Sequence, residues 1–172
     1  MADGSLVEVK PIDGGKGVRT VFAAPDVFAQ LEPGSAKNEF RSSTGHLRKW
    51  LDSFSNGRRL VVGPRRSRTC DMKRLDPAED EVWEIRKQDR PSVRLFGCFV
   101  AKDELVLTNM ELVATLFSSE WFIKGASTWP IWKSEIRNCK ASWRRLFHTY
   151  PPYAGSKLSD YLSRADPERG GW

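Results

Sequence analysis

The chain has 172 residues, enough for one ordinary domain and too few for two large ones, and 40% of them are apolar. Its 28 Lys and Arg residues outnumber the 22 Asp and Glu residues, which gives a net charge of +6. No apolar run approaches the about 20 residues that a membrane helix needs, and no basic segment followed by an apolar run opens the chain. These features argue against membrane and secreted classes, and we expect a cytoplasmic protein.

Three cysteines, Cys70, Cys98 and Cys139, lie far apart in the chain. They predict neither a disulfide framework nor a zinc site, because no two of them have the spacing of metal ligands. The glycines of residues 14–17 lack the GxxxxGK[ST] spacing of a phosphate-binding loop. We therefore expect no metal and no cofactor.

The N-terminal third alternates strand and helix signals. Residues 6–12 predict a short edge strand limited by Pro11, and residues 18–22 predict the second strand of a hairpin. Pro25 suits the first position of a short helix, which the Pro33-Gly34 break ends.

A second helix is predicted from Thr44, a capping residue, to the Asn56-Gly57 stop. Its apolar residues recur at helical spacing: Leu47, Trp50, Leu51 and Phe54. Such a stripe is typical of core packing, so no binding role is assigned to Trp50.

Basic residues concentrate between positions 41 and 74. This segment contains ten basic residues and only two acidic residues, Asp52 and Asp71, which gives it a net charge of +8. The ten are Arg41, Arg48, Lys49, Arg58, Arg59, Arg65, Arg66, Arg68, Lys73 and Arg74. Such a block favours a polyanionic partner, although a solvated surface loop is the simpler alternative. Residues 57–76 are predicted to form a loop or linker.

Three strands follow Asp76-Pro77, at residues 82–86, 92–100 and 105–108, joined by short connectors. They predict an antiparallel meander. The alternation of side chains puts Trp83 and Ile85 on one face of the first strand, with Glu84 and Arg86 on the other. Residues 110–117 are predicted to be helical or irregular.

Residues 131–147 form the strongest helical pattern in the chain. An apolar seam comprises Trp132, Ile136, Cys139, Trp143 and Leu146. A basic ridge, Lys133, Arg137, Lys140 and Arg144, runs about 100° round from it. The ridge is either a solvated flank or a phosphate-binding surface.

Trp132 and Trp143 are assigned to the core, whereas Trp121 and Trp129 lie in irregular sequence and suit nucleobase stacking or protein contacts. Residues 156–164 predict a short terminal helix.

The predicted order is a helix, a basic loop and a meander, and Met72-Lys73-Arg74-Leu75 leads into the strands at residues 82–86 and 93–96. This order resembles the RelE/HigB superfamily of toxin-like ribonucleases, in particular its phage-derived HigB-like branch. The resemblance covers residues 44–108. It implies an α+β fold in which a small antiparallel sheet packs against N-terminal helices, here with an added C-terminal amphipathic helix. It also implies metal-independent cleavage of messenger RNA, often at the ribosome.

The resemblance assigns catalytic roles to Lys73, Arg86 and Arg94, which match the family's lysine and strand arginines and are expected to share an exposed face. His148 or Tyr150 would supply the acid for the leaving oxygen. The family places further catalytic residues after the last strand, where this chain has residues 108–112 without a base or cation.

We therefore expect one domain over residues 1–165, with a RelE/HigB-like core at 44–108, a helical extension at 120–165 and a frayed tail at 166–172. The first hypothesis is an endoribonuclease of toxin–antitoxin type, with an antitoxin as protein partner. The alternative is a non-catalytic basic protein of a phage or mobile element that inhibits a host nucleic-acid-handling complex of CRISPR type. The expected nucleic-acid-binding residues are Arg58, Arg59, Arg65, Arg66, Arg68, Arg74, Lys133, Arg137, Lys140 and Arg144.

Overall fold

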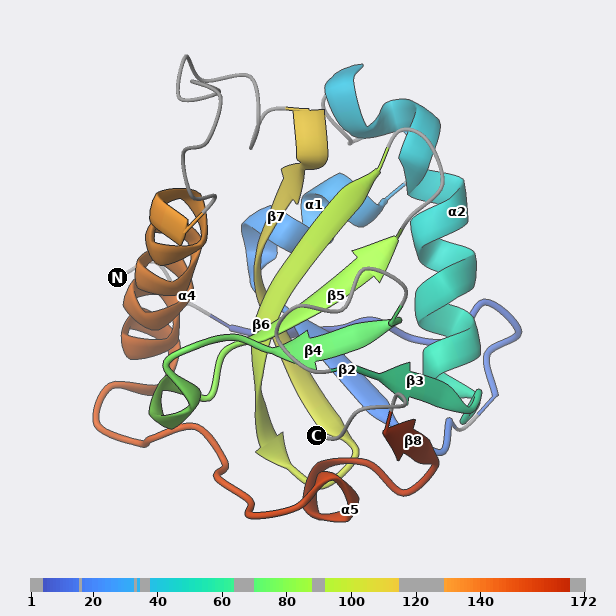
Figure 1. The fold of residues 1–172 in the computed structure, drawn as a ribbon. Helices are drawn as coiled ribbons and strands as arrows, with labels where there is room; N and C mark the ends of the chain where they lie inside the picture. The colour runs from blue at the N-terminus through green and yellow to red at the C-terminus, as the bar shows by residue number, and fades with distance from the viewer. Residues whose placement is uncertain are drawn as a thin grey trace.

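The structure is a computed structural model that describes residues 5–15, 17–32, 34, 38–63, 70–87, 92–114 and 129–167. A twisted sheet forms the middle layer, with α1 (Pro25–Leu31) and α2 (Asn38–Ser55) on one face and α4 (Trp129–Phe147) on the other (Figure 1). The expected α+β class, with a sheet against N-terminal helices and a C-terminal amphipathic helix, is confirmed, and the sheet is mostly antiparallel. Within the described residues no helix has the length and apolar character needed to cross a membrane.

Eight strands make up the sheet, in the order β1-β2-β7-β6-β5-β4-β3-β8. Their bounds are Val7–Glu8, Thr20–Ala23, Leu60–Val62, Met72–Arg74, Trp83–Lys87, Val93–Ala101, Glu104–Leu112 and Ala165–Pro167 for β1 to β8. β4 to β7 pair antiparallel, which confirms the predicted meander, while β2 pairs parallel to β7 and β3 pairs parallel to β4 and β8.

The last strand of the meander is longer than predicted. β7 continues to Leu112, because Met110 and Leu112 pair with Leu95 and Val93 of the equally long β6. The prediction of a helical or irregular segment from residue 110 was therefore wrong at its start.

A bulge interrupts the pairing of β6 with β7 beside Gly97, where a Cβ atom would lie 2.1 Å from the carbonyl oxygen of Val106. Only glycine allows this approach of the two strands.

The N-terminal hairpin and the short α1 are confirmed, since β1 and β2 pair antiparallel and Pro25 lies in the first turn of α1. The start of α2 was predicted too late. Thr44 is not its cap but lies inside it, where its hydroxyl donates to the carbonyl oxygen of Phe40 at 3.1 Å. Buried Phe40 extends the apolar stripe by two turns towards the N-terminus, so the helix begins at Asn38.

The basic segment at residues 57–76 is not a loop throughout, because β3 and β4 lie within it. Leu60 and Val62 are buried and Val61 is exposed, the alternation of a half-buried strand. Asp166 and Pro167, expected in a frayed tail, pair with Val61 and Val62. One of the two neighbours of β3, the strand β8, therefore comes from residues distant in the sequence.

The two faces of the sheet carry separate apolar clusters. Trp83, Ile85 and Phe99 pack towards α1 and α2, whereas Phe96 and Val106 pack towards α4. The seam of α4 is as predicted: Ile136, Cys139 and Trp143 are buried, and Trp132 and Leu146 are partly buried against the same cluster. α4 therefore turns its basic ridge away from the sheet.

Candidate nucleic-acid interface

Three of the four predicted catalytic residues converge on one carboxylate. Lys73 of β4, Arg86 of β5 and Arg94 of β6 project from the face of the sheet that α4 covers, and all three reach Glu84 of β5. The Nζ atom of Lys73 lies 3.0 Å from Oε2 of Glu84, and the Nε atoms of Arg94 and Arg86 lie 2.7 and 3.5 Å from Oε1. We call these four residues the Glu84 cluster.

The Glu84 cluster is buried, so the expectation that Arg86 and Arg94 share an exposed face was wrong. The Glu84 side chain is 0% exposed, and those of its three partners are about one-tenth exposed. Trp132 of α4 closes over the cluster, with its ring centroid 5.7 Å from the Lys73 ammonium. Burial lowers the pKa of Arg94, an effect that the Glu84 carboxylate opposes. This arrangement ties β4, β5 and β6 together beneath α4.

The fourth predicted catalytic residue, His148, lies elsewhere. It is exposed and follows the last residue of α4, with a left-handed φ of 54°. Trp132 contacts Lys73 near the other end of α4, and sixteen residues of helix span about 24 Å. The structure therefore does not bring His148 to the Glu84 cluster.

The basic block between residues 41 and 74 has seven basic residues within the described ranges, and four of them pair with carboxylates: Arg58, Arg59, Lys73 and Arg74. Arg58 pairs with Asp71 at 3.0 Å, and Arg59 forms an ion pair with Asp166 that raises the arginine pKa. Arg65, Arg66 and Arg68 lie outside the described residues.

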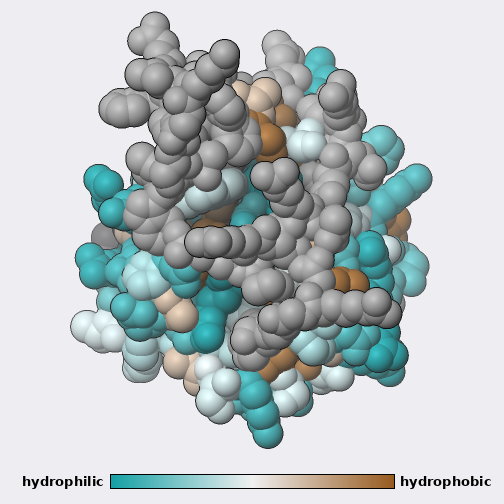
Figure 2. Space-filling model, in the orientation of Figure 1, coloured by the Kyte–Doolittle hydropathy of each residue, from teal (hydrophilic) through white to brown (hydrophobic). Residues whose placement is uncertain are grey.

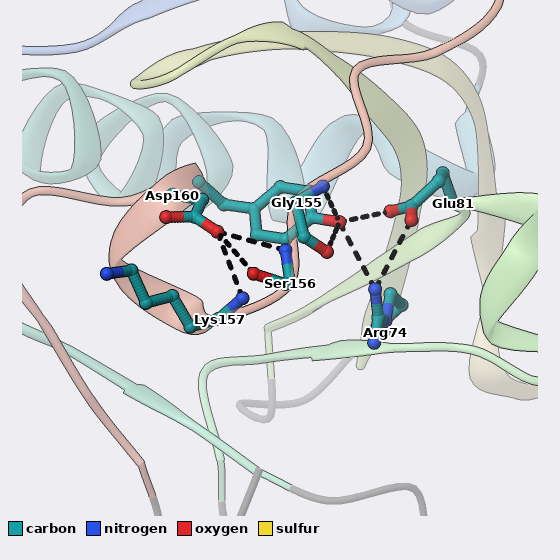
Figure 3. A network of polar contacts seen from close by, with 7 residues as sticks. Arg74, Glu81, Gly155, Ser156, Lys157 and Asp160 are labelled. Carbon is teal, nitrogen blue, oxygen red and sulfur yellow. Dashed lines mark hydrogen bonds and ion pairs between the residues drawn. The ribbon is translucent and has the colours of Figure 1, made fainter.

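Arg74 belongs to a partly buried polar network that Figure 3 shows from close by. Its Nη1 lies 3.3 Å from Glu81 and 3.1 Å from the Tyr161 hydroxyl, which donates to Glu81 at 2.6 Å. Burial, followed by this hydrogen bond, raises the pKa of Tyr161 to about 12. The network fastens α5 (Leu158–Tyr161) to the sheet, so Arg74 is a structural residue rather than an exposed binding residue.

The ridge of α4 is exposed. Lys133, Arg137 and Arg144 are exposed and Lys140 is partly so, at spacings that place all four on one stripe. They line an open groove of about 400 Å³, whose other wall contains Pro77 and Asp80. Lys140 forms an ion pair with Asp80. Neither Arg137 nor Arg144 contacts a carboxylate in the part of the chain that the structure describes.

The one acidic residue of α4, Glu135, points to the sheet. The Glu135 carboxylate accepts a hydrogen bond of 2.7 Å from Nδ2 of Asn109 and another from Asn138. Burial raises the pKa of Glu135, and the two hydrogen bonds oppose that shift. The outward face of α4 therefore carries no carboxylate of its own. Hydrophilic side chains predominate along the left side of Figure 2, where α4 lies in Figure 1.

A second hollow of about 210 Å³ lies at the C-terminal end of α4. It shares Asp80, Lys140 and Arg144 with the groove, and it is completed by residues that include Trp143, His148, Tyr150 and Pro152. The predictions included His148 and Tyr150 as acids, but the hollow itself has no signature in the sequence.

Within the described residues, no group of three or more His, Cys, Asp or Glu side chains is placed to hold a metal ion. Cys98 and Cys139, whose sulfur atoms are 3.7 Å apart, are buried between β6 and α4. Comparison with protein-family models, with curated proteins and with solved structures gave no match. The RelE/HigB resemblance therefore stays a prediction.

Proposed function

We propose that this protein binds nucleic acid through the exposed face of α4, as a binding protein rather than a nuclease. One observation carries the proposal: Lys133, Arg137, Lys140 and Arg144 form an exposed stripe along a groove. Asp80 is the one carboxylate among the residues that line this groove. Such a surface attracts the phosphate backbone of a nucleic acid, and its affinity depends on released counterions.

The dimensions of the stripe suit a nucleic-acid backbone. Eleven residues of helix from Lys133 to Arg144 span about 17 Å, and one strand of a duplex rises about 3.4 Å per phosphate. The stripe therefore runs alongside roughly five phosphates. Arg137 and Arg144 add planar guanidinium groups, which bind two phosphate oxygens at once.

The test is the salt dependence of binding by the double variant Arg137→Ala/Arg144→Ala. A fluorescein-labelled oligonucleotide is titrated with protein at several concentrations between about 50 and 200 mM salt, and binding is followed by fluorescence anisotropy. We expect an affinity loss of about tenfold or more. The slope of log affinity against log salt should shrink by about 1.4–1.8, because each lost phosphate contact contributes about 0.7–0.9.

The matched control removes two arginines at the other side of the molecule, as Arg58→Ala/Arg59→Ala. It changes the net charge equally, so its slope should stay close to that of the wild type if binding is local to α4. A wild-type affinity and slope for the Arg137/Arg144 variant would overturn the proposal.

The endoribonuclease is the second candidate, favoured by the convergence of Lys73, Arg86 and Arg94 on a carboxylate. A metal-independent ribonuclease needs a base for the 2′-hydroxyl and cations for the charge on the phosphate. Glu84 and its partners are groups of these kinds, but their burial favours a structural role. The test incubates the protein with free single-stranded RNA and a chelator and, separately, with messenger RNA under translation. Cleavage that Arg94→Lys abolishes supports the nuclease, and RNA that stays intact in both reactions rejects it.

A further inference from the structure

The side chain of Tyr150 stands out at the end of the α4 groove. Among the side chains whose exposure the structure describes, it is the one Phe, Tyr or Trp that is exposed, at 76%. A single exposed aromatic ring lowers the stability of the fold only slightly. Beside a cationic groove, such a ring offers a flat surface to an unpaired base.

The backbone that presents Tyr150 is held firmly. Its N–H donates to the carbonyl oxygen of Phe147 at 3.0 Å, and its carbonyl oxygen accepts from Nε1 of the buried Trp143 at 2.8 Å. Pro151 and Pro152 restrict the next two residues, and the N–H of Tyr153 donates to Phe99 of β6 at 2.8 Å. The backbone that carries the ring therefore needs little ordering when a ligand stacks on it.

The hollow beside Tyr150 continues the groove. Both are lined by Asp80, Lys140 and Arg144, so a phosphate backbone bound along the stripe leads to His148 and Tyr150. The volume of about 210 Å³ is below the about 300–1,000 Å³ of pockets that enclose whole small ligands. A hollow of this size suits a fragment such as one nucleobase.

We propose that this hollow, with Tyr150 as the stacking surface, receives one unpaired nucleobase, so that the ligand of α4 is single-stranded nucleic acid. The inference rests on the proposed function and specifies its substrate class. In a duplex the faces of the bases are stacked on one another and closed to Tyr150, whereas a single strand presents them. Every base has such a face, so the site selects strandedness rather than sequence.

The experiment measures anisotropy with labelled oligonucleotides of about 12 nucleotides, within the about 4–16 nucleotides that single-strand-binding domains cover. The probes are an unstructured strand as DNA and as RNA, the DNA duplex, and an abasic DNA strand. We expect the wild type to prefer the single strands to the duplex and the abasic strand. Tyr150→Ala should weaken binding of the base-containing strands by on the order of tenfold, and Tyr150→Trp should retain it.

The abasic strand is the internal control, since Tyr150→Ala should leave its affinity unchanged. Unchanged binding of base-containing strands by Tyr150→Ala would overturn the inference, as would equal affinity for duplex and single strand. If Arg137→Ala/Arg144→Ala still weakens binding in that case, the proposed function stands without the stacking site. If neither variant weakens binding, both proposals fail.

Discussion

Two groups of cations on either side of one helix have opposite environments. The Glu84 cluster lies between the sheet and α4, and its three cations share a fully buried carboxylate. The ridge of α4 faces outward, and Arg137 and Arg144 have no carboxylate partner within the described residues. The same residue types therefore stabilise the fold in one place and remain available for a ligand in the other. Sequence motifs do not distinguish these uses, whereas burial does.

The largest expected effect comes from Glu84→Gln, which keeps the shape of the side chain and removes its charge. The cations of Lys73, Arg86 and Arg94 would then remain buried around a neutral amide. Breaking a buried ion pair in this way costs about 3–5 kcal/mol, so the free energy of unfolding in urea should fall by about that amount.

Glu79→Gln serves as the control for Glu84→Gln, because Glu79 is exposed in the turn before β5. It should change the free energy of unfolding by less than about 0.5 kcal/mol. Equal stabilities of the two variants would remove the distinction between the Glu84 cluster and the surface charges.

A smaller loss is expected for Tyr161→Phe, which removes the hydroxyl that donates to buried Glu81. The buried Glu81 carboxylate then lacks one hydrogen-bond donor, which should lower the free energy of unfolding by about 1–3 kcal/mol.

The pH dependence of unfolding sharpens this prediction. The pKa of Tyr161 is raised to about 12 in the folded protein, above the value of about 10 in an unfolded chain. The neutral hydroxyl therefore contributes stability that is complete below about pH 10 and disappears as the pH rises through about 12. In chemical unfolding at stepped pH, the wild type should lose more stability over this window than Tyr161→Phe. Parallel losses in both proteins would contradict the role of the hydroxyl.

The smallest effect concerns the partner of Lys140. Asp80→Asn removes the carboxylate from the wall of the groove and releases the Lys140 ammonium. Two unit charges 4 Å apart in water interact by about 1 kcal/mol, so affinity for a single strand should rise by up to about fivefold. Because ion pairs at the rim of an open groove contribute little, stability should fall by less than about 1 kcal/mol. A weaker affinity would indicate that Asp80 positions Lys140 for the ligand instead of competing with it.

Local patterns in the sequence predicted the parts of the fold that depend on local spacing. The helical period of residues 131–147 predicted both the buried seam and the ridge of α4, and the alternation of residues 82–86 predicted that Glu84 and Arg86 share a face. β3 was missed because it has three residues and its neighbours include β8, about a hundred positions away.

The sequence could not predict the environment of the Glu84 cluster. Its convergence depends on the register of three strands, which pairs Lys73 with Glu84 and Arg86 with Arg94. Its burial depends on α4, whose Trp132 closes over Lys73. The hollow at Tyr150 likewise arises where the turn after α4 meets residues of the turn before β5, two segments far apart in the chain.

The most direct test of the account is a map of amide chemical-shift changes in the isotope-labelled protein on addition of a single-stranded oligonucleotide. The account predicts that the changes concentrate at residues 133–150, along the ridge and around Tyr150, and that the amides of Lys73, Glu84 and Arg94 change little. Changes concentrated at the Glu84 cluster with α4 unaffected would contradict it.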